Sequence, residues 1–205
     1  MLNKNFLKKV EMTEKIFNKI LRTQYGITID INFLDKNIPE DKLIQTLKEN
    51  VLIIKYIDKH NLTENVCIQA VKINYSAIKY IDKYSQTENV CIQAIKQNPN
   101  IIEFIHKDNQ AETVCLEAVK RIPSSIKYIH KDNQTETVCL EAVKRIPSSI
   151  KYIHKDNQTE TVCLEAVKRI GCVLDFINKE NLTELIWIEA IKQNPNIILR
   201  IADFN

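Results

Sequence analysis

Five cysteines recur at intervals of 24 residues, and their thiols are the first candidates for chemistry in this 205-residue chain. A zinc site needs about four ligands that converge on the metal, usually as two pairs that are close in sequence. No C-x-x-C pair occurs, and Leu43 and Trp187 occupy the same register in other copies of the period. Stacked helices, at about 8–10 Å, also hold neighbouring copies too far apart for a disulfide. The sequence therefore predicts buried, reduced thiols with no metal and no cofactor. The column comprises Cys67, Cys91, Cys115, Cys139 and Cys163, and Cys172 lies outside it.

Histidine forms a shorter column with the same spacing. Imidazole groups could titrate near neutral pH or bind a metal, but no cysteine or carboxylate stands at ligand spacing from them. Aspartate or asparagine replaces histidine in other copies, so we interpret the column as solvated side chains at a helix end. The histidines are His106, His130 and His154, and the replacements are Asp58, Asp82 and Asn178.

Lysine occupies one register in all seven copies, and a second lysine register runs beside it. This lysine ridge is the candidate ligand-facing surface, because spaced lysines can bind the phosphates of a nucleic acid. The interpretation that we favour is a solvated helix face. Each ridge lysine follows a Glu or Gln by three residues near a helix C-terminus, where a cation is favoured by about 0.3–1 kcal/mol. Acids recur as regularly, and no exposed aromatic side chain is expected for base stacking. The ridge is Lys48, Lys72, Lys96, Lys120, Lys144, Lys168 and Lys192; the second register is Lys59, Lys83, Lys107, Lys131, Lys155 and Lys179; the acids are Glu64, Glu88, Glu112, Glu136, Glu160 and Glu184.

Composition excludes several classes of function. The chain has two glycines, Gly26 and Gly171, so a glycine-rich phosphate-binding loop cannot be built. No hydrolase or zinc-protease motif occurs, and residues repeated in every copy argue against a single active site, so we expect no enzyme. The net charge of +3 is too small to require a nucleic acid or an anionic membrane as partner. No apolar run approaches the ~18 residues of a membrane span.

The 24-residue period divides the chain from residue 39 onward into seven copies. Two of them, 111–134 and 135–158, differ only at their first residue, Ala111 against Thr135. Each copy contains two short helices, which cannot bury their apolar faces alone and must stack on their neighbours. The predicted fold class is all-α, an α-solenoid of about seven two-helix repeats with an N-terminal helical cap. The copies span 39–62, 63–86, 87–110, 111–134, 135–158, 159–182 and 183–205.

The copy at 135–158 illustrates the two helices. Thr135 is the predicted N-cap of the first, and the apolar residues of Val138–Ile146 cover about 200° of the helical wheel, enough to contact neighbours on two sides. Pro147 ends this helix and begins a second, Ser148–Lys155, which is α-helical or partly 3₁₀.

Three columns of the alignment of copies predict packing. Alanine fills one, where helices must approach closely, isoleucine fills a second, and an aromatic residue precedes that isoleucine in six copies. The columns are Ala70, Ala94, Ala118, Ala142, Ala166 and Ala190; Ile57, Ile81, Ile105, Ile129, Ile153, Ile177 and Ile201; and Tyr56, Tyr80, Phe104, Tyr128, Tyr152 and Phe176.

Residues 1–38 lie outside the period and are predicted to form the helical cap. One or two amphipathic helices stop near Gly26, and Ile27–Phe33 then alternates apolar and polar residues, which is typical of a strand. Because a lone strand is unstable, we expect an extended segment that lies across the first repeat. The alternatives are pairing with the same segment of a second protomer, which would give a homodimer, and disorder.

The motif Cys115-Leu116-Glu117-Ala118-Val119-Lys120, repeated from Cys139 and Cys163, resembles the CLEAVK-type tandem repeats of proteins from giant DNA viruses of amoebae. That family is a domain of unknown function. The resemblance covers about 39–205 and implies a viral helical-repeat scaffold without an activity or a catalytic residue. The chain departs from the usual Asn-Gly between the helices, because only Gly171 retains the glycine. The period is also similar to that of leucine-rich-variant repeats, which pair an α-helix with a 3₁₀ helix.

These patterns predict a non-enzymatic protein–protein interaction scaffold, because a stacked array offers an extended surface and no chemistry. The alternatives are a nucleic-acid or polyanion binder that uses the lysine columns, and a structural component of a virion or viral assembly. We expect a protein partner, no membrane contact and a cytoplasmic location, in the host cytoplasm or a viral factory if the chain is viral.

Overall fold

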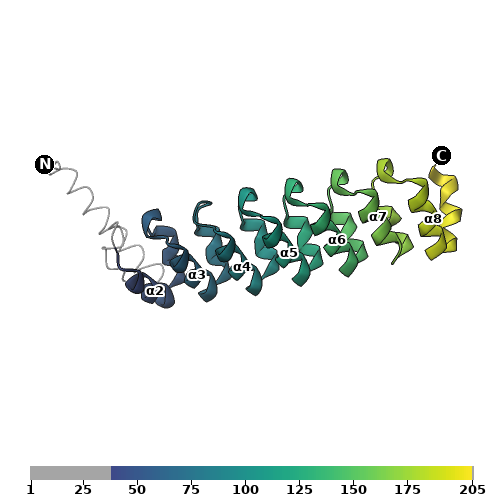
Figure 1. The fold of residues 1–205 in the computed structure, drawn as a ribbon. Helices are drawn as coiled ribbons and strands as arrows, with labels where there is room; N and C mark the ends of the chain where they lie inside the picture. Colours follow the sequence, from purple (N-terminus) through teal and green to yellow (C-terminus); the bar gives the residue numbers. More distant parts are fainter. Residues whose placement is uncertain (1–37, 205) are drawn as a thin grey trace.

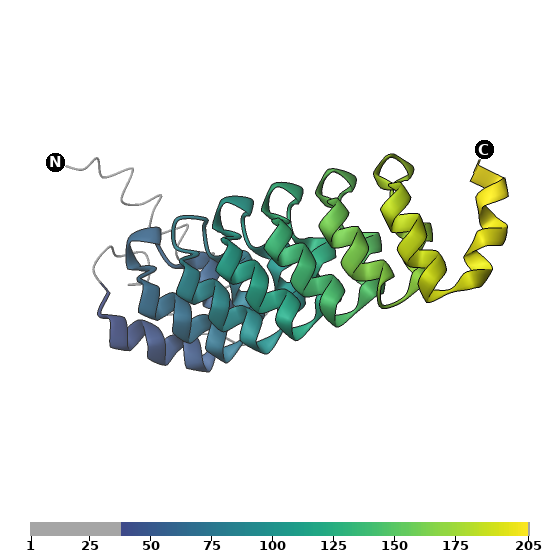
Figure 2. The same cartoon turned by 45° about the vertical axis from the view of Figure 1, so that its right-hand side comes forward.

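The computed structural model describes residues 38–204, and within that range every regular element is a helix. Seven α-helices begin 24 residues apart and stack in one row, which confirms the predicted α-solenoid (Figure 1). Figure 2 shows the same row of nearly parallel helices from a second direction. The predicted cap, extended segment and dimer contact fall on residues 1–37, outside the described range. None of the described helices combines the length and apolarity needed to cross a membrane. The α-helices are α2 (Glu40–Glu49), α3 (Glu64–Ile73), α4 (Glu88–Gln97), α5 (Glu112–Arg121), α6 (Glu136–Arg145), α7 (Glu160–Val167) and α8 (Glu184–Gln193).

A 3₁₀ helix follows each α-helix, and most repeats add a three-residue 3₁₀ turn. In the copy 135–158 the second helix is shorter than predicted, because it ends at Tyr152 and Lys155–Asn157 forms a separate turn. The backbone is extended at Ile153 (φ −79°, ψ 130°), where the side chain of Gln158 binds the carbonyl oxygen at 3.3 Å. The helices are η2 (Val51–Tyr56), η4 (Tyr75–Tyr80), η5 (Pro99–Phe104), η7 (Pro123–Tyr128), η9 (Pro147–Tyr152), η11 (Gly171–Phe176) and η13 (Pro195–Phe204); the turns are η3 (Lys59–Asn61), η6 (Lys107–Asn109), η8 (Lys131–Asn133), η10 (Lys155–Asn157) and η12 (Lys179–Asn181).

Threonine and asparagine side chains fix where the helices begin. Thr135 Oγ1 accepts a hydrogen bond from the backbone N–H three residues on (3.4 Å), as predicted for the N-cap of α6. Asn98 caps η5 by accepting the N–H of Asn100 (3.0 Å), and Pro99 is the first residue of that helix. Ala111 stands at the N-cap of α5 and offers no side-chain bond, so one interior repeat lacks this stabilisation.

One continuous apolar core runs along the stack. The predicted alanine and cysteine columns are fully buried, with 0% of each residue exposed. The isoleucine column is also buried wherever the structure describes its side chains, since 3–7% of each residue is exposed. The assignment of Ile146 to the apolar arc is wrong, because 46% of it is exposed. α6 ends at Arg145, and the extended backbone at Ile146 (φ −137°, ψ 100°) moves its side chain out of the helical register.

Glycine replaces proline at one junction between the two helices of a repeat. A Cβ atom on Gly171 would lie 2.8 Å from the carbonyl oxygen of Ala190 and 2.9 Å from Oε1 of Gln193. The backbone N–H of Gly171 donates a hydrogen bond to that same Gln193 oxygen (2.8 Å), which proline could not do. Glycine therefore allows α8 to approach this junction closely.

Candidate functional site

Buried glutamines connect the interior repeats. Gln134 is only 6% exposed, and its Nε2 donates to the carbonyl oxygens of Ile126 (3.1 Å) and Ile129 (3.3 Å) in its own repeat. The same Nε2 also donates to the carbonyl of Tyr152 in the next repeat (3.3 Å), and Oε1 accepts the N–H of His154 there (2.8 Å). We name this series the glutamine ladder; the sequence analysis did not identify it. The Oε1 bond recurs at Gln86, Gln110 and Gln158.

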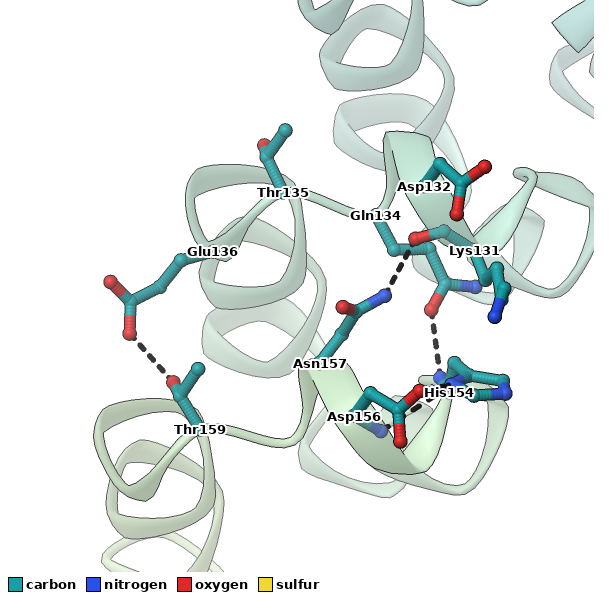
Figure 3. A pocket seen from close by; sticks show the side chains of 9 residues that line it. All are labelled: Lys131, Asp132, Gln134, Thr135, Glu136, His154, Asp156, Asn157 and Thr159. Carbon is teal, nitrogen blue, oxygen red and sulfur yellow. Dashed lines mark hydrogen bonds and ion pairs between the residues drawn. The ribbon is translucent and has the colours of Figure 1, made fainter.

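Two more hydrogen-bond ladders join successive repeats (Figure 3). Asn157 Nδ2 donates to the backbone carbonyl of Lys131 in the preceding repeat (2.6 Å). Thr159 Oγ1, while it caps α7, donates to Glu136 Oε1 (2.6 Å). Most of the regularly spaced glutamates therefore bind the N-cap threonine of the next repeat, whereas Glu88 binds Thr113 because Ala111 stands at that N-cap. The equivalent donors are Asn109, Asn133 and Asn181 for the first ladder and Thr63, Thr87, Thr135 and Thr183 for the second.

The cysteine column is structural, as predicted. Cys139 is fully buried, and its Sγ donates to the carbonyl of Gln134 at 3.5 Å. Burial, with a smaller contribution from the charge of Glu136, raises the pKa of this thiol to about 12, so it is protonated at neutral pH. All six cysteines are free, and Cys172 is exposed. Within residues 38–204, no group of three His, Cys, Asp or Glu side chains is placed to hold a metal ion.

The histidine column caps the short 3₁₀ turns. His154 Nδ1 accepts the backbone N–H of Asp156 (3.3 Å) and lies 3.4 Å from that aspartate's carboxylate. Asn178 and Asp58 use a side-chain oxygen for the equivalent bond in other repeats. This shared capping role explains why aspartate and asparagine replace histidine in the column.

A polar cleft lies between the loops of adjacent repeats. One such cleft, of about 230 Å³, is enclosed by 131–136 and 154–159. A second, of about 340 Å³, lies one repeat earlier, between 107–112 and 130–135. Figure 3 shows that the hydrogen bonds of the ladders run from one wall of the first cleft to the other. The polar groups at these clefts hold the repeats together, and they repeat from copy to copy.

The lysine ridge lies along the α-helices near their C-terminal ends, and all seven of its members are exposed. The glutamate three residues before a ridge lysine can pair with an arginine instead: Glu141 forms an ion pair with Arg145 at 2.6 Å and not with Lys144. Arginine four residues on presents a forked donor that suits a carboxylate better than a lysine three residues on. Among the described residues, Lys192 is the one ridge lysine in an ion pair, with Glu189 at 3.7 Å.

The second lysine register lies on the loops and spans neighbouring repeats. Lys83 pairs with Asp108 at 3.7 Å, and Lys155 pairs with Glu180 at 3.8 Å. These lysines therefore meet acids of the next repeat, and their charges are partly neutralised within the protein.

A third basic line, on the 3₁₀ helices, alternates with aromatic rings. Lys127 Nζ lies 4.6 Å from the ring centroid of Tyr128 and 5.9 Å from that of Tyr152 in the next repeat. Lys151 Nζ lies 4.8 Å from Tyr152 and 5.8 Å from Phe176. Each ammonium thus contacts two successive rings in cation–π geometry. We name this surface the lysine–ring row; it comprises Lys79, Phe104, Lys127, Tyr128, Lys151, Tyr152 and Phe176.

Two of the four rings of the row are exposed, so the expectation of no exposed aromatic side chain is wrong. Phe104 is 41% exposed and Phe176 is 43% exposed, whereas Tyr152 is half-buried. Ile150 and Ile153, three residues apart, both face the core. Tyr152, the last residue of η9, lies between them and packs only partly against the core.

Charge changes sign along the row. Glu103, Lys127, Lys151 and Asp175 occupy the same position in four consecutive repeats, and all four are exposed. A hydrogen bond with Tyr128 raises the pKa of Lys127, and the charge of Glu103 adds to the effect, so Lys127 is charged at neutral pH. Lys79 occupies this position one repeat earlier, so along the row a cation, an anion, two cations and an anion follow one another.

Comparison with protein families matches residues 63–110 to a family described as a domain of unknown function, DUF4116. The matched range covers two consecutive 24-residue copies, from the N-cap of α3 to the residue after η6. No curated protein and no solved structure matches the chain.

Proposed function

We propose that the chain is a non-enzymatic scaffold for protein–protein interaction. The observation that carries the proposal is the exposed lysine–ring row, which combines aromatic area with charge on consecutive repeats. Aromatic side chains contribute strongly to protein-binding surfaces because they bury much apolar area at a small entropy cost.

The structural roles of the polar side chains support a binding function. The cysteines, glutamines, threonines and recurring glutamates, which could do chemistry elsewhere, here bind one repeat to the next. An aromatic ring then recurs at the same outer position of successive repeats, which suits an extended partner better than a small substrate. A viral origin, with action in the host cytoplasm or a viral factory, is part of this proposal and rests on the CLEAVK-type motif.

A nucleic-acid partner is the second candidate, and the exposed rings favour it. Proteins that bind single strands combine aromatic stacking platforms with basic grooves. In this row, however, Glu103 and Asp175 occupy the lysine position in two of the repeats. A nucleic-acid strand carries a phosphate at every nucleotide, so its phosphates would meet those carboxylates. We therefore favour a protein partner.

Site-specific photo-crosslinking in expressing cells tests the proposal. A photoreactive amino acid at Lys151 samples the row, and the same amino acid at Lys144 samples the lysine ridge as a matched control. We expect a recurring adduct from Lys151 that protease removes and nuclease does not, and little adduct from Lys144. Adducts that nuclease removes, or equal adducts at both positions, would contradict the proposal.

A further inference from the structure

Successive rings of the lysine–ring row lie about one helix spacing apart. Lys127 Nζ is 4.6 Å from the Tyr128 centroid and 5.9 Å from the Tyr152 centroid, so the two centroids are at most about 10.5 Å apart. Lys151 sets a similar limit between Tyr152 and Phe176. Because stacked helices are usually about 8–10 Å apart, the row is expected to repeat at roughly 8–10 Å.

A polyproline II helix has the same repeat. It has three residues per turn and rises about 3.1 Å per residue, so side chains on one of its faces recur every ~9.3 Å. Its backbone carries no internal hydrogen bonds, and proline rings bind to exposed aromatic side chains in known recognition modes. One turn of such a ligand would therefore match one repeat of this solenoid.

Other peptide conformations fit the row less well. In a β-strand, residues three apart rise ~10 Å but point to opposite faces, so they cannot all meet the row. An α-helix returns to the same face only after seven residues, ~10.5 Å, which is longer than the usual ~8–10 Å spacing of stacked helices, so its contacts would drift out of register over successive repeats.

The charges of the row define a complementary pattern. Glu103, Lys127, Lys151 and Asp175 require basic, acidic, acidic and basic ligand residues at successive turns. Over these four repeats the pattern reads the same in both chain directions, so a ligand that spans only them can bind in either direction; Lys79, one repeat earlier, would add an acidic position. A uniformly anionic ligand, such as a single-stranded nucleic acid, would suit the lysines of the row but would meet carboxylates at Glu103 and Asp175.

We propose that the lysine–ring row binds a proline-rich segment of a partner protein in polyproline II conformation, one ligand turn per repeat. Two acidic residues three apart bind Lys127 and Lys151, and basic residues one turn beyond them face Glu103 and Asp175. The inference rests on the proposed function as an interaction scaffold and specifies the chemistry of its ligand.

Fluorescence anisotropy with the full chain and two labelled ten-residue peptides tests this inference. The matched peptide has arginine at both ends, glutamate at its fourth and seventh residues, and proline elsewhere; the swapped peptide exchanges arginines and glutamates. Each exposed ion pair changes affinity by roughly 1.4- to 5-fold. We therefore expect the matched peptide to bind at least about tenfold more tightly at low salt, with a smaller ratio at high salt.

Charge-exchange variants make the test specific. The variant with Glu103→Lys, Lys127→Glu, Lys151→Glu and Asp175→Lys should reverse the peptide preference. A control with Lys120→Glu and Lys144→Glu alters the lysine ridge and should leave the preference unchanged. Circular dichroism verifies that both variants fold, which we expect because every altered side chain is exposed.

Several results would overturn the inference. The inference is wrong if the matched peptide does not bind, if both peptides bind equally, or if the charge exchange does not reverse the preference. It is also wrong if a helical peptide with acids seven residues apart, or an oligonucleotide, binds more tightly than the matched peptide. If the peptides fail while protein adducts still form at Lys151, the polyproline register is wrong and the scaffold function survives. Nuclease-sensitive adducts at Lys151 would contradict both the polyproline ligand and the scaffold function.

Discussion

Replacing Gln134 with leucine should destabilise the protein by about 2–4 kcal/mol. The substitution removes the acceptor of the His154 N–H (2.8 Å) and the donor to the carbonyls of Ile126, Ile129 and Tyr152 (3.1–3.3 Å). Each buried polar group left without a partner costs about 1–3 kcal/mol, and carbonyls tolerate the loss better than an N–H. Burial of the leucine side chain offsets part of this cost. Leucine fits the position, since Leu62 and Leu182 occupy the same column at the ends of the ladder.

Urea unfolding followed by circular dichroism measures this effect. Gln45 is an exposed glutamine on α2, so Gln45→Leu provides a matched control and should change stability by less than about 0.5 kcal/mol. If Gln134→Leu also lies within about 0.5 kcal/mol of the wild type, the glutamine ladder does not hold the repeats together and the reasoning is refuted.

Three further predictions concern single side chains. Ala111→Thr should add the N-cap bond that Thr135 makes in the next copy and raise stability by about 0.5–2 kcal/mol in thermal melting; a decrease would contradict the capping account. Ser149→Ala should be neutral or stabilising by up to about 1 kcal/mol, because the buried Oγ of Ser149 has no hydrogen-bond partner. Ser125→Ala removes a 2.8 Å hydrogen bond and should cost about 0.5–1.5 kcal/mol, so equal effects of the two substitutions would be inconsistent with the structure. At neutral pH a thiol reagent should modify only Cys172 in the folded protein, and rapid labelling of more than one thiol would show that the cysteine column is accessible. The free energy of unfolding should fall as the pH rises from 9 towards 12, because the column thiols ionise near pH 9.0 in the unfolded chain and only near about 12 in the folded chain.

The repeat architecture could be predicted because it depends on patterns that recur in most copies. The 24-residue spacing, the threonine N-caps and the alanine and cysteine columns each follow from local rules of helix capping and close packing. Thr135 and Pro147 occupy their predicted positions at the start of α6 and η9. The distinction between α and 3₁₀ could not be predicted, because a six-residue segment is too short to show a period.

The interaction surfaces were harder to predict, because burial depends on contacts between copies. A column that holds leucine at Leu62 and Leu182 must be buried, so a glutamine there must find partners inside the stack; that comparison could have revealed the glutamine ladder. The aromatic column was predicted to pack, and the outcome differs from repeat to repeat. Tyr128 and Tyr152 pack partly against the core, whereas Phe104 and Phe176 are 41% and 43% exposed.

The central claim is that the exposed lysines bind a protein partner and not a nucleic acid. A salt titration of nucleic-acid binding tests this claim most directly. Binding of a single-stranded oligonucleotide is measured at about 50 mM and at physiological salt. The wild type is compared with a row variant, Lys127→Gln with Lys151→Gln, and a ridge variant, Lys120→Gln with Lys144→Gln. We predict weak binding even at low salt and little change in either variant, because Glu103 and Asp175 interrupt the row. Sub-micromolar binding at physiological salt that either variant abolishes, with a log–log salt slope of several units, would contradict the account.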